Sequence, residues 1–178
     1  MPDSETLIVE LPEPGVLKLL GAVNMAWSSL DATVSGALAT AIGGDPVSSF
    51  ISFGQLETVP KMARLQMILT HKGDQASAQK LAAIKRVLNE HRDLRNAITH
   101  GFYLGRTSKQ EICYSLIHQM LTNEPGRTAT VFFAADANDL SAHIDAVMGV
   151  NRDLLALLDV GALRSILLLP SRVRPTGG

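Results

Sequence analysis

The stretch HRDLRNAITHGFYLGR, residues 91 to 106, decides the fold because a helical pattern ends inside it and a strand pattern begins. Before Gly101, apolar residues recur at steps of three and four, which is the spacing of one helix face. These residues are Leu81, Ile84, Leu88, Leu94 and Ile98. After Gly101, alternation and aromatic residues are typical of strands. We therefore predict a helix that begins near Asp74, a good N-cap residue, and ends at Gly101 in a left-handed C-cap.

Helical periodicity extends on both sides of this stretch. Upstream it predicts a first helix from about Pro14 to Ile42 and a second helix from Thr58 to about His71. The segment between these two helices, DPVSSFISFGQLE, is expected to be a connector or a short helical turn. Downstream, a last helix opens at Asp136 or Asn138 and carries apolar residues as far as Leu158.

Three strand-like segments lie between the third and the last of these helices. They are GFYLGR, EICYSLIHQML and RTATVFFAA, with TNEPGR as a turn between the last two. We predict a mainly α fold, namely an antiparallel bundle of four main helices with a small antiparallel β-hairpin or meander inserted between the third and fourth helices. A hairpin is marginally stable by itself, so this one must pack against the bundle or a partner.

Length and composition indicate one folded domain. The chain has 178 residues, of which 46% are hydrophobic and 19% charged, and this is enough apolar material for one core. We expect a single domain over residues 1–178, with flexible tails at residues 1–13 and 165–178. The formal net charge of -1 gives no general attraction to nucleic acid or to an anionic membrane, so any such binding must be local.

Cysteine usage and the N-terminus predict the compartment. The single Cys113 excludes an intramolecular disulfide and a cysteine metal cluster, and we expect it to be a small buried side chain in a strand. The first residues, MPDSETLIVELPEPG, lack the basic region followed by an apolar run that marks a secretory signal. We therefore expect a cytoplasmic protein that does not bind a membrane.

Polar side chains gather at the end of the predicted third helix. At about 3.6 residues per turn, Arg92, Asn96 and His100 share one face, and Arg95 projects from the adjacent stripe. Free carbonyls in the last turn of a helix favour an imidazolium at His100, which suits a general acid or base. An arginine can hold a phosphate through a bidentate fork, so Arg92 and Arg95 are candidate phosphate ligands.

A purely structural interpretation of these side chains is also open. Basic residues complement the helix dipole in the last turn, and an Asn or a His there can bond to free carbonyls. Spacing alone favours this interpretation, because Arg and His are common near helix ends. Asp31 and Glu90 are the acidic residues most able to orient an arginine of this face, although each is more often a solvated charge.

Four further histidines are scattered along the chain without the spacing that places two metal ligands on one helix face. They are His71, His91, His118 and His143. We expect surface or hairpin positions for them, and we expect no metal site and no cofactor. Trp27 lies on the apolar stripe of the first helix and is predicted to be a core or interface anchor.

The string RNAITHG, from Arg95 to Gly101, resembles the signature of the HEPN (higher eukaryotes and prokaryotes nucleotide-binding) superfamily, in which an Arg and a polar residue are followed by a His. The order of elements is also similar to that of small bacterial HEPN-like proteins. In those proteins a strand-rich insert follows the motif, and an acidic cap with a Leu, here Asp136 to Leu140, opens the last helix. The resemblance covers about Val16 to Leu158, and only the short string is specific.

This resemblance implies a helical bundle that forms a homodimer with its two motifs facing each other. In the active members, that arrangement makes a metal-independent endoribonuclease of toxin or defence type. By the same resemblance, His100 would act as the acid/base group or orient the 2′-hydroxyl, Arg95 would stabilise the charged phosphorane, and Asn96 would position both. Arg92 is predicted to bind substrate because its guanidinium can hold a phosphate. The implied partners are RNA, a second copy, and an antitoxin or another protein.

Two other functions stay open. One is a non-catalytic HEPN-like dimerisation or protein-interaction module. The other is a nucleotide-binding regulatory bundle, in which Arg92 and Arg95 hold a phosphate without cleaving anything.

Overall fold

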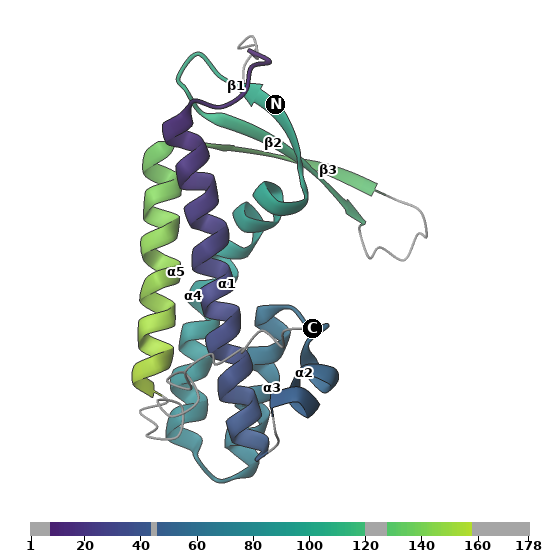
Figure 1. Cartoon of the computed structure of the whole chain (residues 1–178), viewed down its shortest axis with the longest axis vertical. Coiled ribbons are helices and arrows are strands. Elements are labelled where there is room, and N and C mark those ends of the chain that lie inside the picture. Colours follow the sequence, from purple (N-terminus) through teal and green to yellow (C-terminus); the bar gives the residue numbers. More distant parts are fainter. Residues whose placement is uncertain (1–7, 44–45, 120–127, 158–178) are drawn as a thin grey trace, which may run out of the picture. The chain divides into compact units, whose positions relative to one another are not determined.

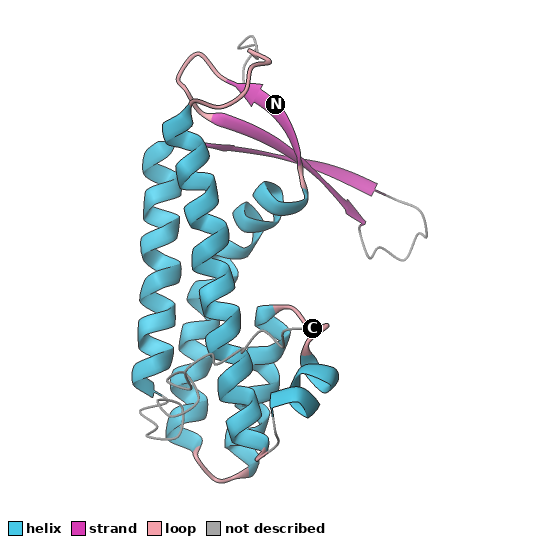
Figure 2. Cartoon of the chain, in the orientation of Figure 1, coloured by secondary structure: helices cyan, strands magenta, loops and turns pink. Residues whose placement is uncertain are grey.

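A computed structural model describes residues 8–43, 46–119 and 128–157, and this part of the chain is mainly helical with a small antiparallel sheet (Figure 2). The mainly α class and the position of the sheet before the last helix are as predicted. The elements in chain order are α1 (Pro14–Ile42), α2 (Pro46–Phe53), α3 (Thr58–His71), α4 (Gln75–His100), β1 (Phe102–Arg106), β2 (Ile112–Gln119), β3 (Thr128–Ala135) and α5 (Ala137–Leu157) (Figure 1).

Local signals account for most helix boundaries. Gly43 follows α1 with a φ of 69°, and Gly73 separates α3 from α4 with a φ of 83°, both in the left-handed region that glycine fills without steric cost. Asp74 caps α4 as predicted, because its Oδ1 accepts a hydrogen bond from the Ser77 backbone N–H at 3.0 Å. The segment expected to be a connector or a short turn forms the eight-residue helix α2.

Gly101 ends the helical run as predicted, but the predicted left-handed C-cap is wrong. Its φ is not among the positive values, and its N–H still donates to the Ala97 carbonyl at 2.9 Å. Glycine is required here because a Cβ would lie 2.3 Å from the Ala97 oxygen and 2.9 Å from the Ser115 oxygen. Two backbone oxygens, one from Ala97 of α4 itself and one from Ser115 of β2, therefore select glycine at the end of α4.

The strands form an antiparallel sheet in the order β1-β2-β3, so the meander prediction is confirmed. A bulge between Tyr103 and Gly105 interrupts the pairing of β1, and Gly105 has a φ of 133°. The turn predicted at residues 122–127 lies outside the described residues.

Part of the predicted N-terminal tail is joined to β1. Ile8 exchanges backbone hydrogen bonds with Arg106, and the Arg106 guanidinium pairs with Glu10 at 2.8 Å and with Glu13 at 3.1 Å. Residues 1–7 and the predicted tail at 165–178 lie outside the described residues. Within the described ranges, no helix is both long and apolar enough to cross a membrane.

The chain divides into two compact units, and each is described by itself. The first contains residues 1–30 and 84–151, and the second contains residues 31–83 and 152–178. Buried apolar side chains of the first unit come from α1, α4, the sheet and α5; they include Val23, Leu30, Leu88, Ile112, Tyr114, Leu140 and Val147. The core of the second unit includes Val34, Leu38, Met62, Leu65 and Leu81.

Helix directions within the first unit follow from specific contacts. Asn24 and Trp27 of α1 meet Thr99 and Arg95 of α4 in reverse order, so these two helices are antiparallel. In the same unit α1 and α5 lie side by side and run in the same direction (Figure 1). The sequence predicts antiparallel neighbours, which holds for α4 against α1, whereas α1 and α5 are parallel because the chain enters α5 from the sheet.

Candidate functional site

The last turns of α4 bring together three of the four predicted site residues. Arg95 Nη1 donates a hydrogen bond to Asn96 Oδ1 at 2.9 Å and lies 3.3 Å from His100 Nε2. Asn96 and His100 share a helix face at a spacing of four residues, and the long side chain of Arg95 reaches both. Thr99 donates to Asn24 Oδ1 at 3.2 Å, which ties this end of α4 to α1.

The contact between Arg95 and His100 is compatible with a hydrogen bond in one form of the ring. A guanidinium can only donate hydrogen bonds, so the bond forms when His100 Nε2 is the acceptor, that is, when the ring is neutral with its proton on Nδ1. A neutral ring with an unprotonated Nε2 can accept a proton, which is the property of a general base.

One face of the Arg95 guanidinium is occupied by an aromatic ring. The guanidinium carbon of Arg95 lies 5.8 Å from the centroid of the Trp27 ring, within cation–π range. Both of its polar side-chain contacts use Nη1, so among the described residues Nε and Nη2 have no hydrogen-bond partner. These two nitrogens form the donor fork that binds a phosphate in bidentate fashion.

Trp27 is in turn held by a buried histidine. The Trp27 indole N–H donates to His143 Nε2 at 2.9 Å, and the two side chains are 6% and 2% exposed. The ring of His91 meets that of His143 edge to face, with centroids 5.0 Å apart. The predicted role of Trp27 as a core anchor is confirmed, whereas the predicted surface or hairpin position is wrong for His143.

The environment of His143 keeps its ring neutral. Burial, with repulsion from His91 as the second cause, lowers the pKa of His143 from 6.5 to about 4. Since Nε2 accepts the indole N–H, the proton of the neutral ring is on Nδ1, which is buried and has no hydrogen-bond partner among the described residues. His143 is therefore a fixed hydrogen-bond acceptor near neutral pH.

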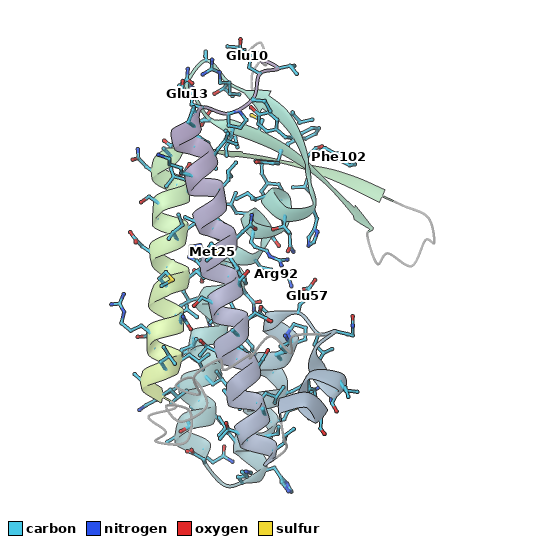
Figure 3. All side chains as sticks on the ribbon, viewed as in Figure 1. Glu10, Glu13, Met25, Glu57, Arg92 and Phe102 are labelled. Atoms are coloured by element: carbon cyan, nitrogen blue, oxygen red, sulfur yellow. The ribbon has the colours of Figure 1, made fainter. Side chains whose placement is uncertain are left out.

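Arg92, the predicted substrate-binding residue, does not join this group. Its Nε lies 3.5 Å from Asp93 Oδ1, and both side chains are largely exposed (Figure 3). Neither acidic residue proposed to orient an arginine does so in the described part of the chain: Asp31 binds Lys61 at 2.7 Å, and Glu90 forms no ion pair with Arg92 or Arg95.

A metal centre finds no support among the described residues. No three His, Cys, Asp or Glu side chains of this part of the chain come together in a way that could hold an ion. Cys113 is buried in β2, as predicted. The chemistry available at the end of α4 is consequently that of a cation, a carboxamide and an imidazole.

Comparison with known proteins gives no relative from which a function could be transferred: no family model, no curated protein and no solved structure matches the chain.

Sequence reasoning missed His143 and its contact with Trp27, although a signal was present. The buried positions of α5 recur at steps of three and four, and His143 occupies one of them. These positions are Leu140, His143, Val147, Val150 and Leu154. The apolar face predicted for this helix also includes Met148 and Leu155, and both are exposed.

Proposed function

We propose that this chain is a HEPN-like protein and a metal-independent endoribonuclease, with Arg95, Asn96 and His100 as its reactive group. In this proposal α1, α3, α4 and α5 are the four main helices of the bundle. The observation that carries the proposal is the contact of one guanidinium with both Asn96 and His100 at an exposed helix end. The RNAITHG resemblance supplies the reaction class, and the geometry supports it.

The proposed reaction is attack of a ribose 2′-oxygen on the adjacent phosphorus. His100 Nε2 accepts the 2′-hydroxyl proton, the O2′–P bond forms, and the P–O5′ bond breaks to leave a 2′,3′-cyclic phosphate. Arg95 stabilises the charge on the phosphorane oxygens through Nε and Nη2. The 2′-hydroxyl replaces the Arg95 N–H as the donor to His100 Nε2, while Nε and Nη2 of Arg95 bind the phosphate.

A second copy of the chain completes the proposed site. The departing 5′-oxygen needs a proton, and one neutral imidazole cannot supply it before it has become protonated. In a two-fold dimer with facing motifs, the His100 of the other copy, when protonated, serves as the acid. Two copies of Arg92 and Arg95 would also concentrate positive charge in a chain whose net charge is -1.

The test is cleavage of single-stranded RNA in EDTA by the wild-type chain and by Arg95→Ala and His100→Ala. Loss of one acid/base group should lower the rate by about 100- to 10,000-fold, with 2′,3′-cyclic phosphate ends on the products of the wild type. Intact RNA with pure wild-type dimer would refute the proposal.

Two matched controls come from exposed positions of the same chain. His71 ends α3 as His100 ends α4, and Arg86 is an exposed arginine earlier in α4. His71→Ala and Arg86→Ala should cleave RNA at the wild-type rate. If a control variant loses as much RNA cleavage activity as the matching site variant, the loss comes from the change in net charge or from a copurified nuclease.

A non-catalytic association module is the second candidate, and exposed aromatic residues favour it. Ser115 of β2 pairs with Phe102 of β1 and with Phe132 of β3, so the three residues lie on one face of the sheet. Phe102, which Figure 3 labels on the sheet, is 63% exposed, and Phe132 is 57% exposed. Neighbouring exposed aromatics are typical of protein-binding surfaces.

Sedimentation measurements separate this candidate from the enzyme. If the sheet face mediates association, the Phe102→Ser and Phe132→Ser double variant should dissociate at concentrations where the wild type and His100→Ala associate. Ile51→Ser, which removes an equally exposed apolar side chain from α2, is the control. Unchanged association of the double variant would exclude this face as the interface.

A further inference from the structure

A contact path leads from the proposed reactive group to a histidine that the proposed chemistry does not use. Arg95 touches Asn96 and His100 with Nη1 and lies against the Trp27 ring at 5.8 Å. The edge of that ring donates to His143 Nε2 at 2.9 Å. All of these residues belong to the first compact unit, and they come from α1, α4 and α5.

The geometry of an indole links these two contacts. The N–H of Trp27 lies in the plane of the ring, so a hydrogen bond to it restricts the rotation of the ring about its side-chain torsions. The face of the ring is where a guanidinium is attracted. An acceptor at the edge of Trp27 therefore determines where the face is, and the face determines where Arg95 is held.

We propose that Trp27 and His143 are positioning residues that hold the Arg95 guanidinium where it meets Asn96 and His100. The proposal rests on the proposed function for its consequence in catalysis, because Arg95 is the group that would stabilise the phosphorane. The placement of Arg95 by Trp27 and His143 is a separate physical claim and can be tested without RNA.

Competing roles of His143 conflict with its contacts. Nε2 is already occupied by the indole N–H, and Nδ1 carries the proton of the neutral ring, so metal binding at either nitrogen would disrupt the Trp27 hydrogen bond or require a second deprotonation. The ring is 2% exposed, which keeps it from touching an RNA substrate. What remains is a buried acceptor that orients its donor.

Kinetics of four variants test the positioning role. Trp27→Leu removes the ring, and His143→Leu removes the acceptor, whereas His143→Gln offers a carbonyl oxygen to the indole. We expect kcat to fall about 5- to 30-fold in Trp27→Leu, the range for loss of a cation–π contact, with a much smaller change in KM. His143→Leu should lose a similar factor, and His143→Gln should recover most of it. Trp27→Phe, which keeps an aromatic face but has no N–H, should fall between the wild type and Trp27→Leu.

A matched core variant separates positioning from general destabilisation. Met62 is fully buried in the second unit, so Met62→Ala should lower the melting temperature and leave kcat unchanged. If Met62→Ala lowers kcat as much as His143→Leu does for a similar fall in melting temperature, the positioning role is overturned.

NMR spectroscopy tests the placement itself, whatever the outcome with RNA. Trp27 is the chain's one tryptophan, so its indole N–H gives a single resonance, which should show a nuclear Overhauser effect to the His143 ring. The Arg95 Nε–H resonance, assigned by its absence in Arg95→Lys, should shift in Trp27→Leu and in His143→Leu but not in His143→Gln. If the Arg95 resonance does not shift in Trp27→Leu or His143→Leu, the positioning proposal is overturned, even if the chain cleaves RNA. If the Arg95 resonance shifts but the chain cleaves no RNA, the endoribonuclease proposal is refuted and the placement of Arg95 by Trp27 and His143 is retained.

Discussion

Two polar clusters, one in each compact unit, differ in how their cation is satisfied. In the second unit Lys61 Nζ lies 2.7 Å from Asp31 Oδ2 and 3.1 Å from Ser35 Oγ, while Thr58 donates to Asp31 Oδ1 at 2.9 Å. The Lys61 side chain is 4% exposed. In the first unit, Arg95 contacts Asn96, His100 and Trp27, and no carboxylate of the described residues pairs with it.

The difference separates a cluster whose charges neutralise each other from one whose cation has no anionic partner among the described residues. Lys61 and Asp31 neutralise each other, so the cluster is closed and has no need of an outside ligand. Arg95 has no carboxylate partner among the described residues, and His100 beside it is exposed. A cation that is held by neutral groups and retains free N–H donors is suited to an anion from outside the chain, which is why the Arg95 cluster supports the proposed phosphate chemistry.

The largest effect on stability is expected from opening the closed cluster. Asp31→Ala leaves Lys61 buried without a counter-charge, and we expect it to lower the free energy of unfolding by about 3–5 kcal/mol. Lys61→Met should cost less, because the Asp31 carboxylate that it leaves is 37% exposed and can be hydrated. Arg95→Ala should change stability by only about 1 kcal/mol, the size of a partly exposed polar contact.

Urea denaturation of the three variants measures this order. The distinction between the charge-neutralised Lys61–Asp31 cluster and the Arg95 cluster is refuted if Arg95→Ala destabilises the chain as much as Asp31→Ala does. It also fails if Lys61→Met is the most destabilising of the three, since the buried cation would then not be the costly partner.

The next largest effect depends on pH and comes from His143. Between pH 6.5 and about 4 the unfolded chain takes up a proton on this imidazole and the folded chain does not, so stability falls across that window. The loss is up to about 3 kcal/mol at about 1.4 kcal/mol per pKa unit, and it levels off below pH 4. Above pH 6.5 the ring is neutral in both states and contributes no pH dependence.

Comparison of the wild type with a variant that lacks the His143 imidazole separates the pH dependence of stability due to His143 from that due to the carboxylates. His143→Gln removes the titrating ring and keeps an acceptor for Trp27, so the wild type should lose stability more steeply than the variant from pH 6.5 to 4. If the free energies of unfolding of the wild type and the variant fall in parallel between pH 6.5 and 4, His143 takes up its proton in the folded chain as readily as in the unfolded one.

Local patterns predicted the helices because caps and periodicity act within a few residues. The limits expected from the sequence agree with those of α1 and α3, and the predicted cap at Asp74 is present before α4. The contact between Asn96 and His100 through Arg95 was also accessible, because all three lie within six residues of one helix.

Features that depend on distant segments were not predicted. The eight-residue helix α2 has a weak local pattern, and the parallel direction of α1 and α5 follows from how the sheet leads the chain back. Periodicity places His143 at a core position of α5, but its hydrogen-bond donor becomes visible only when α5 is packed against α1. Trp27 supplies that donor from 116 residues away.

A substitution at Gly101 should change the contacts of the Arg95 cluster and leave those of the Lys61–Asp31 cluster unchanged. In Gly101→Ala the new Cβ would meet two backbone oxygens, which cannot move as a side chain can, and we expect a loss of about 1–3 kcal/mol. The end of α4 must then shift, so the contact of His100 with Arg95 should be disturbed. Gly21→Ala is the control, because nothing lies within 4 Å of a Cβ there and the helix should gain up to about 1 kcal/mol.

Denaturation and NMR of the Gly101→Ala variant provide the check. Its Arg95 and His100 resonances should shift, and those of Lys61 and Asp31 should not. If Gly101→Ala does not change stability, the end of α4 can move away from both backbone oxygens without cost, and glycine would then have no steric reason at this position.

The smallest effect on stability is expected at Arg92, which tests whether an exposed cation can matter for binding alone. Its pair with Asp93 is long and solvated, so Arg92→Ala should change the free energy of unfolding by less than about 0.5 kcal/mol. If Arg92 contacts phosphate, the variant should bind single-stranded RNA more weakly and lower the slope of log affinity against log salt by about 0.7. Arg86→Ala, exposed on the same helix, should leave that slope unchanged. If the slope of Arg92→Ala equals that of Arg86→Ala, Arg92 makes no phosphate contact. Of the two arginines at this helix end, Arg95 alone would then bind phosphate.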